Sequence, residues 1–536
     1  MNVWVMINDG SGTRSNVVMT DDSGHGEESD GSLSSHTISL RKAYQDCSNE
    51  MERLRKSCDG PSGYAFSKNM LSLARDAWAA AERYRDQRID GINELCQKLS
   101  VSNDIVSLPV DVVNVDRSSA CCLEGKNSTS LSPCEFKQRY HARNVPCIIR
   151  GLGESNFSYI SSQWRKNDCV DTEWFRKFVG DDTKVPVRIE PTNTAIVNQD
   201  NGLDDEGRAT ECDTVEIKLC EWIQYCQTTS EQGQLEMCPL MKIGTAGYLK
   251  DWHLLQFLGK EQSQDTNHHL LHSSTSWLYS VPSIFERDLL NNFLTHYTRG
   301  DYKFVYWGPK GSRTNLHSDV MHSFSWSYNV VGKKHWTFYI PRSNGDGETN
   351  EDKAFQLIQE TGETIFVPAK WKHEVENLSE TLSVNHNWIT AANIDCTFEC
   401  LLTEIASIEQ EIKEWGIIFD DDYEARENML RGCVGIDISM LVMMVLSELV
   451  ELFNTAISRD KNLSNSSARE QDITWDVLYS IFRLRNVLQD VLLGRQDKNV
   501  NVAQRLSATL YSEEFARDVI LFSNFYLESC NTLIER

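Results

Sequence analysis

Residues 302–339 read YKFVYWGPKGSRTNLHSDVMHSFSWSYNVVGKKHWTFY, and residues 362–388 read GETIFVPAKWKHEVENLSETLSVNHNW. In both stretches large apolar residues alternate with polar ones, and Gly, Pro and Asn interrupt the runs. This pattern predicts a succession of short antiparallel strands. Such strands favour a small barrel or a double-sheet jelly roll. We therefore expect an α+β protein with this β-structure at its core.

The rest of the chain is predicted to flank that core with helices. Residues 1–35 are rich in Ser, Gly, Asp and Glu and are expected to be disordered. Residues 36–132 predict a helical extension and a linker, and residues 133–395 the barrel domain with its N-terminal elements. Apolar residues then recur at helical spacing to the end, so residues 396–536 are expected to form a helical domain. These C-terminal helices would pack on the barrel or join two copies in a homodimer.

Composition excludes several classes of protein. The 536 residues carry a net charge of −25, with 78 acidic against 53 basic residues. This excess argues against nucleic-acid binding, which needs clustered Lys and Arg, and it is compatible with a basic protein substrate. The 16 cysteines form no CxxC pair, so reduced thiols are favoured over a structural zinc site.

The sequence predicts neither secretion nor membrane insertion. No basic region followed by an apolar run opens the chain, so no signal peptide is expected. The most apolar stretch, residues 440–453, is short and contains Ser447 and two glutamates, which favours a buried helix over a membrane span. We expect a cytoplasmic protein, with the nucleus as the alternative.

Three residues are candidate metal ligands. His317 and Asp319 are two positions apart, which puts both side chains on one face of a strand or its end. His373 lies in a second strand-like run, WKHEV. Two imidazoles and one carboxylate on one side of a metal leave the opposite positions open, as in non-haem Fe(II) oxygenases. The same ligands also suit manganese, cobalt or zinc, and an HxD pair alone is frequent by chance.

Lys334 supports the interpretation that His317 and Asp319 belong to an enzyme's metal site and are not a chance HxD pair. Period-two spacing places it on the same face as Trp336, Phe338 and Ile340. A buried ammonium group needs an anionic partner, and the distal carboxylate of 2-oxoglutarate is one. The alternative is a lysine that reaches water at a strand edge.

Other polar side chains are candidates for the same cavity. Thr314 can donate its hydroxyl to the carboxylate that Lys334 binds. Asn385 and Asn387 share a face of the last strand, so both amides are expected to point into the barrel or, alternatively, to solvent.

These motifs, in this order, resemble the Jumonji C-domain oxygenases, a cupin-like double-stranded β-helix family. The resemblance covers residues 133–445 and is densest from 248 to 390. It rests on the segments YLKDWH (248–253), YKFVYWGP (302–309), HSD (317–319), FSWS (324–327), GKKHW (332–336), GETIFVP (362–368), WKHEVENL (371–378) and SVNHNW (383–388).

The resemblance implies roles for particular residues. His317, Asp319 and His373 match the family's iron ligands. Lys334 and Thr314 match the positions that hold the distal carboxylate of the cosubstrate, and Tyr248 matches a tyrosine that often assists them. Two positions depart from the family pattern: Ser327 stands where several relatives have Asn, and Asn385 stands where some have Thr.

The implied activity is a dioxygenase that uses Fe(II), 2-oxoglutarate and O2. The resemblance further implies a protein lysyl hydroxylase whose expected substrate is the eukaryotic translation termination (release) factor. The alternatives are a demethylase of histone methyl-lysine, disfavoured by the absence of zinc-finger cysteine spacing, and a non-catalytic cupin scaffold.

Overall fold

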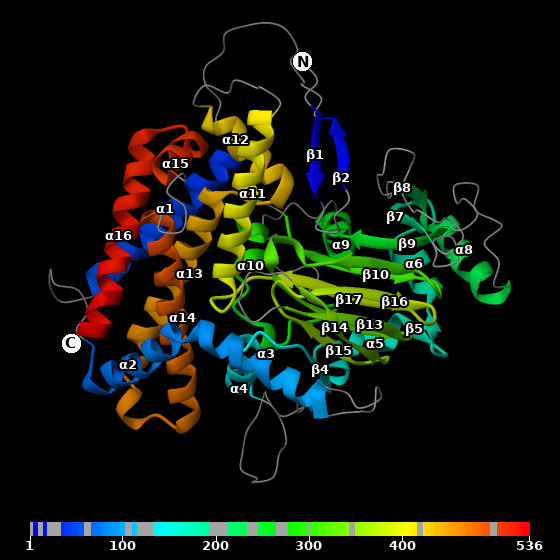
Figure 1. Ribbon diagram of the computed structural model, residues 1–536, viewed down its shortest axis with the longest axis horizontal. Helices are drawn as coiled ribbons and strands as arrows, with labels where there is room; N and C mark the ends of the chain where they lie inside the picture. The colour runs from blue at the N-terminus through cyan, green and yellow to red at the C-terminus, as the bar shows by residue number, and fades with distance from the viewer. Residues whose placement is uncertain are drawn as a thin grey trace, which may run out of the picture.

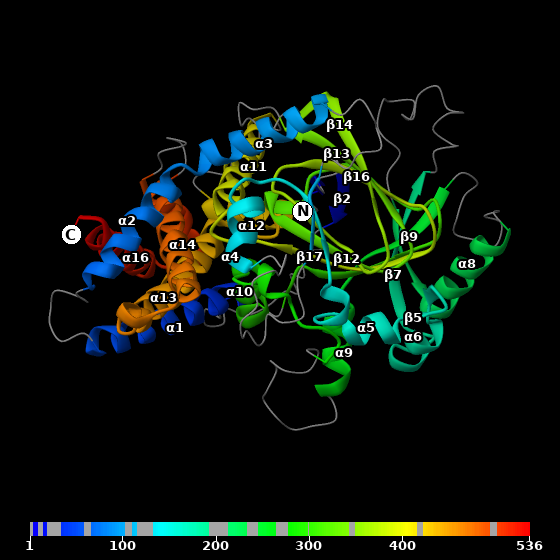
Figure 2. The ribbon, with the colours of Figure 1, turned by 90° about the horizontal axis from the view of Figure 1, so that it is seen from below.

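The computed structural model describes residues 4–8, 14–18, 34–57, 66–101, 110–114, 132–191, 213–232, 245–263, 277–298, 300–341, 349–414, 422–493 and 501–535. The molecule has a β-rich part and a helical part, which lie side by side (Figure 1). Seen from below, the sheets remain on one side and the long helices on the other (Figure 2). This arrangement confirms the predicted α+β class.

The larger sheet contains nine strands, and all of its pairs are antiparallel except β3 with β4. Large apolar side chains on one face of these strands pack into the core of the β-rich part. The strands, in their order across the sheet, are β3 (Val112–Asn114), β4 (Cys147–Arg150), β15 (Thr364–Val367), β12 (Phe324–Val331), β17 (Thr381–Trp388), β10 (Lys303–Gly308), β9 (Thr245–Trp252), β7 (Lys184–Pro191) and β8 (Asp213–Lys218).

The smaller sheet has four antiparallel strands in the order β11 (Arg313–His317), β16 (Lys372–Asn377), β13 (Lys334–Pro341) and β14 (Thr349–Gln359). It faces the larger sheet, because Lys334 on β13 donates a hydrogen bond to Ser383 on β17. Hydrogen bonding among the described strands therefore gives two facing sheets and not the closed barrel, the first of the two architectures we predicted. The polar side chains of interest lie between these sheets.

Short elements cover the outer side of the large sheet and its ends. Phe157, Phe285 and Trp326 are among the aromatic residues that pack there. The elements are α4 (Pro133–Phe136), a π-helical turn (Lys137–His141), η3 (Leu152–Glu154), α5 (Ser158–Gln163), the hairpin β5 (Arg165–Lys166) and β6 (Cys169–Val170), α6 (Thr172–Phe178), α8 (Leu219–Gln232), α9 (Leu254–Ser263), η4 (Ser283–Phe285), α10 (Leu289–Tyr297) and η5 (Val320–His322).

The helical part is built from both ends of the chain. The N-terminal helices α1 and α2 lie among the C-terminal helices and share one apolar core with them (Figure 1). Helix α3 continues from α2 towards the sheets (Figure 2). The helices are α1 (Ser35–Ser57), α2 (Lys68–Glu82), α3 (Tyr84–Val101), α11 (Ile394–Glu414), α12 (Tyr423–Val434), α13 (Ile438–Asp460), η6 (Leu463–Asn465), α14 (Ala468–Leu493), α15 (Val502–Leu510) and α16 (Glu513–Glu535).

Helix α13 is long and apolar enough to cross a membrane by composition alone. In the structure it lies inside the helical part, and 67% of its most apolar window is buried. The expectation of a buried helix between residues 440 and 453 is thus confirmed.

The N-terminal 35 residues contain more structure than we expected. Strands β1 (Trp4–Asn8) and β2 (Arg14–Val18) pair in an antiparallel hairpin. Apolar residues in Trp4–Asn8 and two valines before residue 19 supply strand propensity, which the polar composition of the whole segment had masked. The other residues before Ser34 lie outside the described ranges, as do most of those assigned to the linker.

Candidate metal centre

The small sheet brings together the three predicted ligands. His317 ends β11 directly opposite His373 on β16, and their ring centroids are 4.4 Å apart. Asp319 follows β11 as the residue before the 3₁₀ turn η5. One ligand atom from each residue lies within 4.8 Å of the other two. The set spans two strands and a turn, so one divalent ion can contact all three side chains.

Backbone hydrogen bonds orient both imidazoles. Nδ1 of His317 lies 2.8 Å from the carbonyl oxygen of Asn315, and Nδ1 of His373 lies 3.1 Å from that of Trp371. A carbonyl only accepts, so each Nδ1 carries the proton and each Nε2 keeps a lone pair. Burial, followed by the neighbouring His373 and Lys250, lowers the pKa of His317 well below its usual value. The imidazole is therefore neutral, the form that binds a metal.

A hydrogen bond also orients the carboxylate of Asp319. Ser325 on β12 donates its hydroxyl to Oδ2 of Asp319 at 2.7 Å, which leaves Oδ1 for a metal. Trp336 and Phe338 on β13 flank the His373 ring at 5.6 and 5.7 Å. These contacts fix the three donors before any ion binds, and the donor set of two nitrogens and one oxygen fits a first-row divalent metal.

Lys334 lies where the period-two pattern predicts, between the sheets and only 2% exposed. Its Nζ donates to Oγ of Ser383 at 2.6 Å. Burial, assisted by the positive charge of Lys250, lowers the pKa of Lys334 to about 7. An ammonium group in this position favours an anionic ligand strongly, because a carboxylate would offset both effects.

Thr314 shares the inner face of the small sheet. It pairs with Val375, and the register shifts between Thr314 and His317, so an irregularity in β11 lies between them. This shift allows two residues with odd spacing to face the same side, which a regular strand forbids. The placement agrees with the predicted role beside Lys334, and that role itself stays a prediction.

The remaining predicted residues also line the region between the sheets. Tyr248 on β9 is buried, with its ring 5.9 Å from that of Tyr306. Asn385 donates to Oγ of Ser383, the serine that Lys334 contacts. Asn387 donates to Oγ of Ser323 and so lies further from the lysine. Ser327 is buried opposite Asn385 across β12 and β17.

The sequence analysis missed three residues that contribute to the site, namely Ser383, Ser325 and Lys250. Ser383 and Ser325 orient Lys334 and Asp319, and each sits two positions from a residue we had singled out or matched to the family. Period two therefore contained the signal, but serine is common in strands and carries little information alone. Lys250 is 7% exposed, shares the inner face of β9 with Tyr248, and lies 5.8 Å from that ring.

Comparison with known proteins decides the family. No family model matches the chain. The zebrafish 2-oxoglutarate and iron-dependent oxygenase JMJD4 is 31% identical over 313 residues, which cover 52% of this chain and 67% of that protein. The Drosophila homolog is 34% identical over 349 residues, which cover 59% of this chain and 75% of that protein. The chain belongs to the JMJD4 family of JmjC-domain oxygenases.

A plant protein is similar to this chain over a greater length. The arginine-specific demethylase JMJ20 of Arabidopsis is 27% identical over 438 residues, 74% of this chain and 85% of that protein. Such a long match must include helices outside the sheets. Membership of the JMJD4 family thus confirms the resemblance seen in the motifs between residues 248 and 390.

Proposed function

We propose that this protein is an Fe(II)- and 2-oxoglutarate-dependent dioxygenase that hydroxylates a protein side chain. The observation that carries the proposal is the triad of His317, Asp319 and His373, preformed beside the buried ammonium group of Lys334. We also propose that the two facing sheets form the double-stranded β-helix of the JmjC family. The names of the JMJD4 relatives, which state dependence on 2-oxoglutarate and iron, support the choice of cofactors.

When bound, Fe(II) and 2-oxoglutarate supply the activation of O2, with loss of CO2, formation of succinate and insertion of one oxygen atom into a C–H bond. The protein positions the reactants. The two Nε2 atoms and Oδ1 of Asp319 would hold the metal, which would bind the cosubstrate and activate oxygen. Lys334, with Thr314 beside it, binds the distal carboxylate and fixes the orientation of the 2-oxo acid.

The charge of the cavity suits a dicarboxylate. Lys250 and Lys334 are both buried and close enough for one to lower the pKa of the other. The positive charge of Lys250 adds to that of Lys334, so the region between the sheets favours an anionic ligand. A 2-oxo acid with a second, distal carboxylate can pair with Lys334 and a 2-oxo monoacid cannot, so the site favours 2-oxoglutarate.

We further propose that the modified residue is a lysine of the translation release factor. Family resemblance supports this assignment, and an exposed carboxylate, that of Asp251, is available to a cationic side chain. Asp251 is exposed, has a strained positive φ of 55°, and accepts a hydrogen bond from Tyr306 at 2.8 Å. Burial, followed by the charge of Asp251 and, more weakly, that of Asp319, raises the pKa of Tyr306. A cytoplasmic location would suit this substrate.

The decisive experiment is mass spectrometry of recombinant release factor incubated with the protein, Fe(II), ascorbate and 2-oxoglutarate. We expect one lysine to gain one oxygen atom, with one succinate formed for each hydroxylation. Succinate formation without any modified residue, or no turnover at all, would contradict the proposal. A complete lack of turnover together with no metal-dependent change in melting temperature would favour a non-catalytic scaffold.

Demethylation is the second candidate, because the Arabidopsis demethylase JMJ20 aligns with most of the chain. Hydroxylation of an N-methyl group releases the carbon as formaldehyde, so the same site can perform either reaction. Histone peptides carrying methyl-arginine or methyl-lysine separate the two functions in the same assay. Loss of a methyl group from either peptide would favour demethylation, whereas gain of one oxygen atom by the release factor, with both methylated peptides unreacted, would favour hydroxylation.

A further inference from the structure

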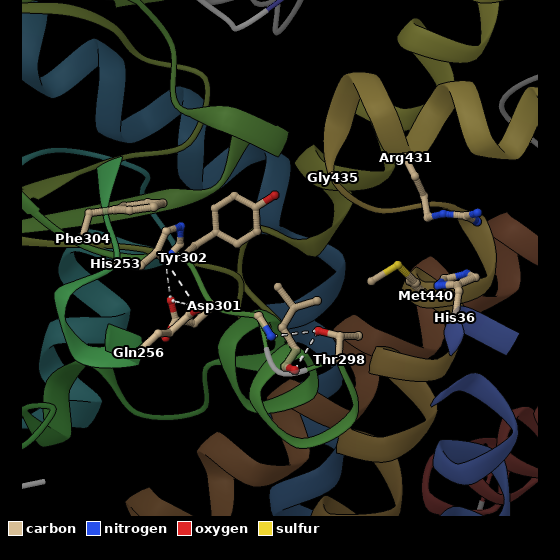
Figure 3. Close-up of a pocket in the computed structure, with 12 residues that line it drawn as sticks. His36, His253, Gln256, Thr298, Asp301, Tyr302, Phe304, Arg431, Gly435 and Met440 are labelled. Atoms are coloured by element: carbon tan, nitrogen blue, oxygen red, sulfur yellow. Dashed lines mark hydrogen bonds and ion pairs between the residues drawn. The ribbon is translucent and has the colours of Figure 1, made fainter. Parts of the chain in front are cut away.

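We infer that a groove between the β-rich and helical parts binds a basic segment of the protein substrate, next to the residue that is modified. The inference rests on the proposed function and extends it to substrate recognition. The groove has a volume of about 500 Å³ and opens between α9, α10 and β10 on one side and α12 and α13 on the other (Figure 3).

One wall of the groove carries a carboxylate prepared for a donor. Oδ1 of Asp301 accepts hydrogen bonds from Nδ1 of His253 at 3.0 Å, Nε2 of Gln256 at 2.8 Å and the backbone N–H of Lys303 at 3.4 Å. Figure 3 shows His253 and Gln256 converging on this group. Within the described part of the chain, Oδ2 accepts no hydrogen bond. The side chain is held in place with one oxygen left for a ligand.

The opposite wall is electrically balanced. The carboxylate of Asp437 contacts Arg431 and lies 3.0 Å from Nε2 of His36. Lys303, although adjacent in sequence to Tyr302 and Phe304, which line the groove, alternates with them along β10 and therefore points to the other face of the sheet. Among the described residues the carboxylate of Asp301 contacts the imidazole of His253 and pairs with no Arg or Lys, so a cationic ligand is favoured over an anionic one.

A row of aromatic rings connects the groove to the metal centre. Tyr302 reaches across to α12, where its hydroxyl lies against Gly435, and Phe304 lines the groove floor. Their ring centroids are 6.1 Å apart, and the Phe304 ring is 6.3 Å from that of Tyr306. Tyr306 donates a hydrogen bond to Asp251 at 2.8 Å, and the charge of Asp319 is among those that, after burial, raise the pKa of Tyr306. These alternate residues of β10 lead from the groove towards the candidate ligands, and we place the bound peptide along them.

The spacing defines the substrate further. Five residues of extended chain separate Asp301 from Tyr306, or roughly 16 Å at ~3.3 Å per residue. A bound peptide in extended form advances by a similar distance per residue. The substrate should therefore carry Lys or Arg about five positions from the modified residue.

The first test measures binding, so that it does not depend on turnover. A short fluorescent lysine–glycine peptide is titrated into the full chain loaded with Mn(II) and 2-oxoglutarate. We expect Asp301→Asn to weaken binding roughly tenfold, since one charge-assisted contact is lost. The matched control is Asp182→Asn, which removes an exposed carboxylate paired with Lys218 and should leave binding unchanged. Equal affinity of wild type and Asp301→Asn would overturn the inference.

Two substitutions of opposite charge at a second position test whether the loss of binding comes from charge and not from misfolding. Thr298 lines the groove near Asp301, so Thr298→Lys should weaken binding of the basic peptide and Thr298→Glu should not. A glutamate–glycine peptide should bind neither wild type nor Thr298→Glu. If it binds wild type as tightly as the basic peptide, the groove does not select by charge.

Assays of turnover distinguish a failure of the proposed function from a failure of the inference about the groove. If wild type fails to modify the release factor, the proposed substrate is wrong, and the peptide titrations alone decide the groove. If wild type modifies it and Asp301→Asn shows the same KM, the inference about the groove is wrong while the proposed function stands. Substrate-independent succinate formation should be equal in wild type and Asp301→Asn.

Discussion

At the scale of single residues, Lys334 links the fold to the proposed chemistry. A buried lysine without its ligand destabilises the protein, and the same charge provides affinity for a dicarboxylate. Lys334→Met should therefore raise the melting temperature of the ligand-free protein. It should also raise the KM for 2-oxoglutarate by roughly 10- to 100-fold, the range for one hydrogen-bonded ion pair. A lower melting temperature with unchanged KM would contradict both assignments.

The pH dependence follows from the same group. Lys334 has a pKa of about 7 in the folded, ligand-free protein, below its value in the unfolded chain. Between these values the unfolded chain binds more protons, so this group's contribution to the free energy of unfolding rises with pH above 7 and is constant below it. Binding of the dianion needs the charged form, so affinity for 2-oxoglutarate should fall as pH rises above 7. Calorimetric titrations of wild type and Lys334→Met test this, since the variant should lose the pH dependence.

The candidate metal ligands and Lys334 could be predicted from the sequence, whereas the residues that surround and orient them could not. His317, Asp319, His373 and Lys334 are rare types in strand-like runs, so period and chemistry together single them out. Ser383 and Lys250 obey the same period, but their value depends on which strands become neighbours. That β17 lies opposite β13 is a long-range property, which local periodicity does not contain.

At the scale of elements, the turn between β12 and β13 positions Lys334. Gly332 has φ +84°, and a Cβ there would lie 1.9 Å from the carbonyl oxygen of Glu380. Gly332→Ala should lower the free energy of unfolding by more than the ~1–2 kcal/mol of a left-handed backbone.

A matched glycine isolates the contribution of the clash. Gly311 has φ +87°, with nothing within 4 Å of the added Cβ, so Gly311→Ala carries the backbone strain alone. Urea unfolding of both variants measures the difference. Equal losses of stability would show that the contact with Glu380 is unimportant.

The helices themselves were easier to predict than the contacts that each helix makes with other helices. Apolar spacing predicted the helical region over residues 396–536, where α11 to α16 lie, because a buried stripe at 3.6-residue period is a local feature. The same spacing after residue 35 predicted helical structure, but it did not reveal that α1 and α2 complete the core of α13, α14 and α16. That contact joins residues some four hundred positions apart.

At the scale of the whole molecule, a buried charge cluster joins three helices that are distant in sequence, α3, α11 and α14. Asp395 at the start of α11 bonds Arg88 of α3 at 2.8 Å and Arg483 of α14 at 2.6 Å. Asp395→Ala leaves two guanidinium groups without their carboxylate and should cost about 3–5 kcal/mol. The half-exposed pair of Lys333 and Glu360 is the control, and Glu360→Ala should cost less than ~1 kcal/mol.

The same cluster predicts behaviour in acid. Although burial opposes its ionisation, Arg88 and Arg483 lower the pKa of Asp395 to about 2. The unfolded carboxyl has its ordinary higher pKa, so this contribution to stability is complete above that value and is lost as pH falls towards 2. Unfolding curves between pH 5 and 2 should show a smaller acid-dependent loss for Asp395→Ala than for wild type.

Metal content tests the central claim most directly, namely that His317, Asp319 and His373 hold one divalent ion. Wild type, His317→Ala and His335→Ala are loaded with Mn(II), desalted and analysed for bound metal and for folding by circular dichroism. His335 lies on the opposite face of β13 from Lys334 and serves as the control. We predict one ion per chain in wild type and His335→Ala and none in folded His317→Ala. Equal metal content in all three would contradict the assignment.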